Sequence, residues 1–133
     1  MTTRREKIAD GWFSKYIRLK NSTPDGICNC ITCHRPFHWK EIDCGHFVSR
    51  SRKIVRFDER NCAPQCKHCN RFKGGEQWKF GKAIDKIYGE GTATYLQGIA
   101  KRPYKRVARD LDYLIEEYKV KAKEEAKKRG IRI

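Results

Sequence analysis

The feature that most constrains this chain is a repeated cysteine spacing: Cys30 and Cys33 are separated by two residues, and so are Cys66 and Cys69. A two-residue gap permits a turn whose backbone N–H groups point at the sulfurs, and two such turns supply four thiolates for one tetrahedral zinc ion. The chain has 133 residues, of which 38% are hydrophobic, which is little material for a large core. We therefore expect a structural zinc ion at these four cysteines to hold a small domain together.

Three further cysteines and one histidine compete with this assignment. Cys28 is separated from Cys30 by a single residue, a spacing that suits an extended strand but makes no such turn, so we interpret Cys28 as a buried thiol. Cys44 and Cys62 are interpreted in the same way, as buried structural thiols rather than ligands. His34 is the alternative to a thiolate in the zinc site.

The charge of the chain indicates a polyanionic partner. The net charge is +15, from 31 Lys and Arg against 16 Asp and Glu, and residues 47–82 carry ten basic residues against three acidic ones. This charge surrounds polar side chains instead of lining one amphipathic helix face, so nucleic acid is favoured over a membrane surface. The chain has neither an apolar run of about 18 residues nor a signal-like N-terminus, and we expect a cytoplasmic protein with no membrane contact.

Apolar periodicity predicts helices around a short region of strands. Within residues 4–20 a stripe at helical spacing is predicted to form the buried face, and it consists of Ile8, Trp12, Tyr16 and Leu19. Strands are predicted over residues 37–47 and, as a short extended segment, over 54–57. Helices are predicted to begin over residues 67–73 and to span 76–88, 92–101 and 104–129. The last helix carries mixed charges, which favours a solvated face, with DNA contact as the alternative.

Asp43, His46 and Asn70 are the candidate chemical groups. A carboxylate and an imidazole three residues apart can flank one reacting phosphate when the segment that carries them is held in place. We expect Gly45 to let the backbone turn so that Asp43 and His46 face the same point. Asn70 directly follows Cys69, so zinc at that cysteine would also fix the asparagine. These residues predict a metal-dependent nuclease site.

Five motifs follow one another in an order typical of a known family. They are Cys30-Ile31-Thr32-Cys33, Asp43-x-Gly45-His46, Arg56-Phe57-Asp58-Glu59-Arg60-Asn61, Gln65-Cys66-x2-Cys69-Asn70 and Lys73-Gly74-Gly75. Together they resemble the HNH, or ββα-metal, endonucleases, and more closely the NinG/Rap recombination endonucleases of lambdoid phages. The resemblance implies an α+β fold with a small zinc-stapled ββα-metal (HNH) core, wrapped by N- and C-terminal helices. The expected segments are an N-terminal helix in residues 1–22, the nuclease core in 27–75 and a helical region in 76–133.

The resemblance also implies an activity. The expected protein is a structure-selective DNA endonuclease that hydrolyses phosphodiester bonds in branched DNA, such as Holliday junctions and D-loops, during phage or prophage recombination. Its expected setting is the cytoplasm of a bacterial host. The partners implied are branched DNA, a second copy of the chain in a homodimer, and a phage or host recombinase.

In this interpretation four residues carry the chemistry. Neutral His46 takes the proton from water, with a role as a metal ligand as its alternative. Asp43 and the side-chain carbonyl of Asn70 bind one Mg²⁺ or Mn²⁺ ion, because hard cations prefer oxygen ligands. Asn61 matches the middle asparagine of the HNH pattern and would hold the histidine segment in place, with a simple turn asparagine as its alternative.

The sequence leaves open which basic residues contact DNA and to which functional class the protein belongs. The candidate DNA-binding residues are Arg50, Arg52, Lys53, Arg71 and Lys73. Among 31 basic residues, none of these assignments is unique. A non-catalytic zinc module that binds DNA or a recombinase is the first alternative. It would use the same two Cys-x2-Cys turns, here called knuckles, and the same positive charge, but it needs no converging carboxylate, base and amide. A sequence-specific HNH restriction or homing nuclease is the second alternative.

Overall fold

A computed structural model describes residues 2–133, and its first element is helix α1 (Arg4–Lys20). Thr3 begins the helix with a capping box, in which its hydroxyl accepts from the Glu6 N–H at 3.1 Å and its own N–H donates to the Glu6 carboxylate at 3.0 Å. The helix is where it was predicted, but its buried face is shifted. Of the predicted stripe, Leu19 is buried, Trp12 and Tyr16 are half-buried and Ile8 is 43% exposed. The helix also buries Ala9, Phe13 and Ile17, because tertiary packing turned the neighbouring stripe inward.

Two short antiparallel hairpins follow. The first pairs β1 (Ile27–Asn29) with β2 (Pro36–His38), and the second pairs β3 (Asp43–His46) with β4 (Cys62–Gln65). The single strand predicted over residues 37–47 is therefore wrong, because a turn separates β2 from β3 and each pairs with a different partner. The extended segment predicted over residues 54–57 is also wrong, since a 3-10 helix, η1 (Lys53–Val55), begins there.

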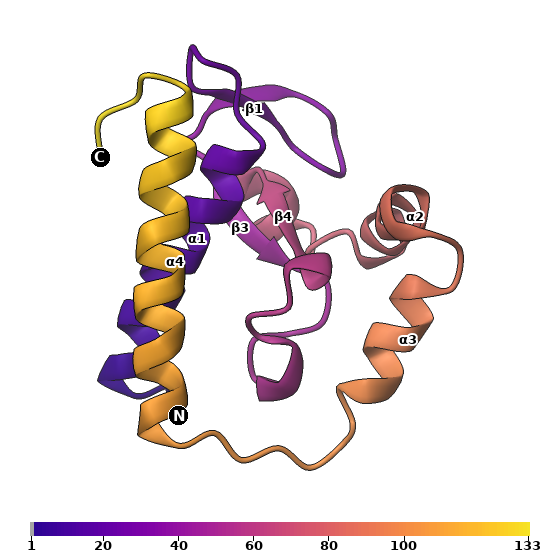
Figure 1. Ribbon diagram of the computed structural model, residues 1–133. Helices are drawn as coiled ribbons and strands as arrows, with labels where there is room; N and C mark the ends of the chain where they lie inside the picture. The colour runs from indigo at the N-terminus through magenta and orange to yellow at the C-terminus, as the bar shows by residue number, and fades with distance from the viewer. Residues whose placement is uncertain (1) are drawn as a thin grey trace.

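The remaining elements are helical. A short 3-10 turn, η2 (Glu59–Asn61), leads into β4, and a five-residue π-helix, η3 (His68–Phe72), follows it. The three later helices are α2 (Gln77–Tyr88), α3 (Thr92–Ile99) and α4 (Ala108–Lys128). The last helix was predicted to begin at residue 104. It begins four residues later, because residues 101–107 form the connection that brings the chain back from α3 (Figure 1).

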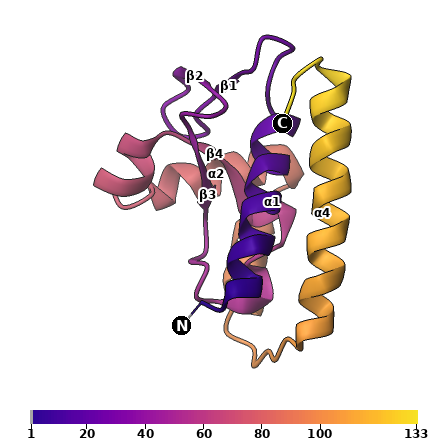
Figure 2. The same ribbon diagram turned by 90° about the vertical axis from the view of Figure 1, so that its left-hand side faces the viewer.

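Helices α1 and α4 lie side by side and run in the same direction (Figures 1 and 2). Arg5 pairs with Asp112 at 3.2 Å near the N-terminal ends, and Arg129 donates to the Lys20 carbonyl at 2.9 Å near the C-terminal ends. On the far side of β3 and β4 from this helix pair lie α2 and α3 (Figure 1). No helix among the described residues is long and apolar enough to cross a membrane.

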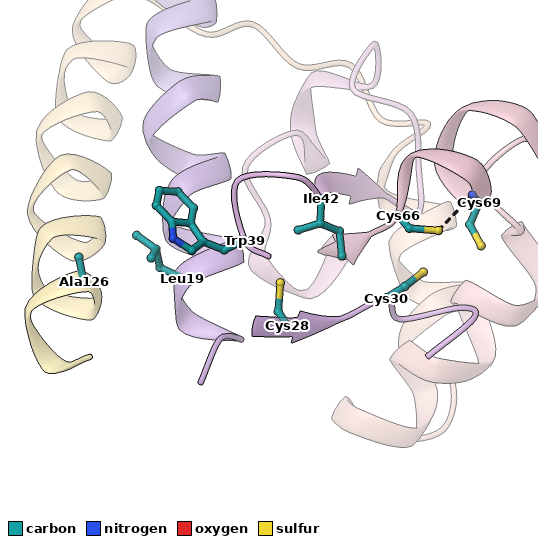
Figure 3. Close-up of a cluster of buried hydrophobic side chains, with 8 residues drawn as sticks. All are labelled: Leu19, Cys28, Cys30, Trp39, Ile42, Cys66, Cys69 and Ala126. Carbon is teal, nitrogen blue, oxygen red and sulfur yellow. Dashed lines mark hydrogen bonds between the residues drawn. The ribbon is translucent and has the colours of Figure 1, made fainter. Parts of the chain in front are cut away.

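The knuckle region shares a hydrophobic cluster with the terminal helices. Trp39 and Ile42 pack between the cysteines and the helix pair, where they meet Leu19 from α1 and Ala126 from α4 (Figure 3). The result is a mixed structure of helices and two small sheets, in which the helices at the two ends of the chain pack together. The partner strand of β3 is β4, at Cys62–Gln65, instead of the segment predicted over residues 54–57, and the helical turn η3 follows it within the predicted range 67–73. In the predicted segment 1–22, residue 1 lies outside the described residues.

Candidate functional site

The four cysteines of the two knuckles form one cluster. The sulfurs of Cys30, Cys33, Cys66 and Cys69 all lie within 4.8 Å of one another, and those of Cys33 and Cys66 are 3.8 Å apart. In each knuckle a backbone N–H donates to a sulfur, from Cys33 to Cys30 and from Cys69 to Cys66, both at 3.4 Å (Figure 3 shows the second). Four soft ligands in this arrangement fit a tetrahedral structural zinc ion.

The thiols of this cluster differ in acidity. Burial acts to raise the pKa of the Cys30 thiol, but hydrogen bonds from the Thr32 hydroxyl and from backbone N–H groups outweigh burial and lower that pKa to about 6. Burial raises the pKa of the Cys66 thiol to about 12. A zinc ion would therefore have to displace protons from the cluster as it binds.

The cysteines outside the cluster occupy two places. Cys28 is buried beside Trp39 and Ile42, and its sulfur lies apart from those of Cys30, Cys66 and Cys69 (Figure 3). Cys44 and Cys62 lie on the second hairpin, where Cys62 is buried and Cys44 is half-buried. Both are thus in a structural core, but together with His46 they also form a second group of three ligand atoms within 4.8 Å of one another.

A cleft of about 810 Å³ opens beside the four-cysteine cluster. Its lining comes from α1, from the turn before β3, from β3 and the loop that follows it, and from the segment between residue 67 and the start of α2. Its basic lining residues are Arg18, Lys40, Arg50, Lys67 and Arg71, and its acidic ones are Asp10 and Asp43. Positive charge thus outnumbers negative charge in a hollow that also contains His46 and Asn70, which suits a phosphate-bearing ligand.

Asp43 and Asn70 are in direct contact in this cleft. The Asn70 Nδ2 donates to Asp43 Oδ2 at 2.9 Å. Arg71 forms a two-pronged ion pair with the same carboxylate, donating Nε to Oδ2 and an Nη to Oδ1, both at 3.0 Å. The carboxylate and the amide predicted to share a cation are therefore adjacent, with the Arg71 guanidinium as the present counter-ion of Asp43.

His46 has one ring nitrogen held by the backbone. Its Nε2 lies 2.9 Å from the Arg56 carbonyl oxygen, which can only accept, so Nε2 carries the proton and Nδ1 keeps the lone pair. Burial lowers the pKa of His46 below its ordinary value. The imidazole is therefore neutral at neutral pH, the form that a general base needs.

The turn expected at Gly45 does not occur. Strand β3 pairs with β4 in unbroken register through Gly45, so successive side chains alternate between the two faces. His46 lies on the face toward α1, 6.3 Å from the Phe13 ring, while Asp43 faces Asn70 on η3. Gly45 is needed for space instead, because a Cβ there would lie 2.5 Å from Gln65 Oε1. Asp43 and His46 nonetheless line the same cleft.

Asn61 is fully buried beneath the loop that follows His46. Its Oδ1 accepts from the Val48 N–H at 2.8 Å, and its Nδ2 donates to the carbonyls of Val48 at 3.0 Å and Val55 at 3.2 Å. The amide thus ties both ends of the loop together, close to the residue whose carbonyl holds His46. This is the geometry expected of a positioning asparagine.

The predicted DNA-binding residues separate into two groups. Arg50 and Arg71 line the cleft, while Lys53 pairs with Glu6 at 3.2 Å, Lys73 lies 3.9 Å from Glu76, and Arg52 is exposed.

The prediction from sequence missed three basic residues of the cleft, Arg18, Lys40 and Lys67. Arg18 on α1 and Lys40 in the turn before β3 reach the cleft only through the fold. It also missed the buried Arg56, whose guanidinium donates to Asp10 on α1 and whose carbonyl holds His46.

Two aromatic side chains stand out beside the cleft. Phe72 is 80% exposed and Trp78 is 73% exposed, and they flank the segment whose residues Gly74, Gly75 and Gln77 line the cleft. Lys82 lies 4.1 Å from the Trp78 ring centroid. Exposed rings among basic side chains provide a surface on which unpaired bases can stack.

The chain was also compared with known proteins. A family model described as bacteriophage lambda NinG protein matches residues 3–128. The chain belongs to the NinG family of phage proteins. The match extends from α1 to the end of α4, so it includes the cysteine cluster and every residue of the cleft described above. No curated protein and no solved structure matches the chain.

Proposed function

We propose that this NinG-family protein is a metal-dependent, structure-selective DNA endonuclease of the HNH, or ββα-metal, type. The observation that carries the proposal is the content of one basic cleft. It holds an adjacent carboxylate and amide, Asp43 and Asn70, together with a neutral imidazole, His46, whose other nitrogen is held by a carbonyl. A module that only binds DNA has no need of this combination.

Each residue has a defined part in phosphodiester hydrolysis. His46 Nδ1 accepts the proton of the attacking water, and the Arg56 carbonyl keeps the imidazole in the tautomer that can do so. Asp43 and Asn70 would hold a Mg²⁺ or Mn²⁺ ion, which stabilises charge on the phosphate and on the leaving oxygen. Arg71, which is 58% exposed, is free to move from Asp43 to a phosphate of the substrate. Asn61 positions the loop around His46.

Branched recombination intermediates, such as Holliday junctions and D-loops, are the substrates that we propose. The exposed Phe72 and Trp78 favour DNA with unpaired bases, because a stacked duplex offers no ring faces at its sides. We further propose that the protein acts in the cytoplasm of a host bacterium during phage or prophage recombination. A homodimer would supply a second cleft for the opposite strand, and a recombinase would deliver the protein to its substrate.

One observation favours the rival function. The Asp43 carboxylate is engaged by Arg71 through both oxygens, as expected of a structural ion pair in a non-catalytic zinc module that binds DNA. The two functions differ in what His46 does, since a binding module needs only the shape and packing of the imidazole, whereas a nuclease needs its lone pair.

The deciding experiment is cleavage of labelled DNA by purified zinc-loaded protein. Four-way junctions, Y-shaped, nicked and linear duplexes are incubated with Mg²⁺, Mn²⁺ or EDTA. We expect cleavage of the branched substrates that needs the divalent cation, and a loss of about 10²- to 10⁴-fold in His46→Ala with junction binding retained. His38→Ala, on β2 and outside the cleft, is the matched control. Binding without cation-dependent cleavage by the unaltered protein would favour the rival.

A further inference from the structure

The second hairpin brings three metal-binding side chains together outside the four-cysteine cluster. Cys44 and His46 are two residues apart on β3 and therefore share a face of the strand, and Cys62 on β4 is the direct partner of His46. One ligand atom from each of the three lies within 4.8 Å of the other two. The four knuckle cysteines meet the same distance limit.

The chemistry of these ligands selects a particular class of ion. Two thiolates and one imidazole suit Zn²⁺ and other thiophilic divalent cations, whereas Mg²⁺ and Mn²⁺ prefer oxygen. Three protein ligands leave the fourth tetrahedral position open, as in zinc sites that also bind water. Cys44 and His46 line the cleft while Cys62 lies buried behind them, so an ion can enter from the cleft and reach all three.

We propose that Cys44, His46 and Cys62 form a second site for a thiophilic divalent cation, and that an ion bound there stops His46 from acting as a base. A neutral imidazole has one proton and one lone pair. Coordination through either ring nitrogen uses that lone pair, so the conclusion does not depend on which nitrogen binds. Zinc would thus support the fold at one site and block the chemistry at another.

The two parts of this proposal are separable. Binding of the ion depends only on the three side chains, whereas inhibition rests on the proposed nuclease function of His46. The site has one ligand fewer than the knuckle cluster, so we expect it to bind more weakly and to empty first on dialysis against a mild chelator.

A metal titration tests the binding. Protein dialysed to one tightly bound zinc per chain is titrated with Co²⁺, and the thiolate-to-cobalt absorption is followed together with the metal content. We expect one additional equivalent with thiolate absorption in the unaltered chain, and none in Cys44→Ser or Cys62→Ser. Cys28→Ser removes a buried thiol outside both groups and should still take up the additional ion. Cys44 is half-buried, so its variant remains informative if Cys62→Ser fails to fold. Absence of the additional equivalent, or its retention in Cys44→Ser, would overturn the site.

A cleavage assay tests the inhibition. Each protein is assayed at fixed Mg²⁺ with increasing Zn²⁺, and its activity is expressed relative to its own rate without added zinc. We expect the unaltered chain to lose half of its activity when the second site is half filled and to regain it with chelator, whereas Cys44→Ser needs at least about tenfold more zinc for the same fractional loss, which corresponds to about 1.4 kcal/mol. Full cleavage with the second site occupied would overturn the inhibition. A chain without cleavage under any condition would instead contradict the proposed function, and the titration would still decide the site.

Discussion

Asp43 accepts hydrogen bonds from Asn70 and Arg71 at once, so a cation entering the cleft meets a carboxylate that already has a positive partner. A divalent ion can replace the arginine because it carries twice the charge and is compact, while Arg71 can swing toward solvent. Arg71 would then neutralise the charge of Asp43 before substrate binds and contact a phosphate of the substrate afterwards.

Asp43 and Asn70 should differ in how much cleavage depends on them. Asp43→Asn keeps the size of the side chain but removes the charge that holds the cation, so we expect cleavage to be abolished. Asn70→Ala removes a neutral ligand that water can partly replace, so we expect residual activity that rises with Mn²⁺. The measurement is cleavage rate against Mn²⁺ concentration, with zinc content followed in parallel. Full activity of Asp43→Asn with zinc retained would contradict the proposed cation site.

The regular pairing of strand β3 decides the directions in which its side chains point. This pairing places Asp43 toward η3 and His46 toward α1, and side chains from both faces of the strand line the same cleft. Gly45, between them, packs against the side chains of Gln65 and Phe80 from β4 and α2. The strand can therefore sit this close to its neighbours only because one position lacks a Cβ.

Two glycine-to-alanine changes should have opposite effects on stability. In Gly45→Ala the new Cβ would lie 2.5 Å from Gln65 Oε1 and 2.8 Å from Gln65 Cβ, so we expect a loss of about 1–3 kcal/mol. Gly11 lies inside α1 with nothing within 4 Å of an added Cβ, so Gly11→Ala should gain about 0.5–1 kcal/mol from helix propensity. Urea unfolding of both variants measures the two signs. An unchanged midpoint for Gly45→Ala would show that Gln65 can move aside.

Helix α2 carries Trp78, which we expect to discriminate between DNA structures. Stacking on an aromatic side chain is worth about 1–3 kcal/mol per base, so Trp78→Ala should weaken binding to a fork with unpaired bases by about 5- to 150-fold. Binding to a linear duplex should change little. Tyr113→Ala is the control, because Tyr113 is 69% exposed but lies on α4, outside the cleft. An equal loss of affinity for the fork and for the duplex would mean that Trp78 does not distinguish between the two DNA structures.

For the molecule as a whole, the cysteine cluster is the main expected source of stability. A structural zinc ion contributes on the order of 10–16 kcal/mol, whereas a small domain has a total stability of only about 5–15 kcal/mol. We expect a strong chelator to unfold residues 28–73, as measured by circular dichroism and hydrogen exchange. Cys66→Ser should do the same without chelator. A melting curve unaffected by either change, or the absence of bound zinc in elemental analysis, would contradict the four-cysteine assignment.

Glu59 links the two terminal helices, α1 and α4, and makes the stability of the protein depend on pH. Its carboxylate accepts from the hydroxyls of Tyr16 at 3.2 Å and Tyr118 at 3.1 Å, and it lies 3.4 Å from the ammonium groups of both Lys20 and Lys121. Burial acts to raise the pKa of Glu59, but Tyr118, Lys121 and Lys20 outweigh burial and lower it. The resulting stability is present above the unfolded pKa of about 4.5 and is lost as the pH falls through the lower folded pKa.

Glu59→Gln should isolate this contribution. We expect the variant to be less stable than the unaltered chain by about 1–3 kcal/mol at pH 6, because the charged acceptor is lost. The difference in melting temperature between the two proteins should shrink below about pH 4, where both carry a neutral side chain. Comparing the two proteins at each pH removes the shared effect of acid on the cysteine thiolates. A difference independent of pH would assign the effect of the substitution to packing.

The sequence by itself determined the local chemistry of this protein. The Cys-x2-Cys spacings predicted the four-sulfur cluster, because each spacing forms its own turn over a few residues. Asp43 and Asn70 were singled out by their residue types and by their place in the motifs, although their contact joins two distant segments. The helix over residues 4–20 was also predictable, since its capping residues and apolar period are local signals.

Only the tertiary structure decided which distant residues share the cleft. It brought Arg18 and Asp10 of α1 to β3, placed the Arg56 carbonyl on His46, and gathered Cys44, His46 and Cys62 on one face of a hairpin. It also selected the buried stripe of α1 and the start of α4. These features depend on long-range packing of helices against small sheets, a sum of many weak contacts that no local spacing records.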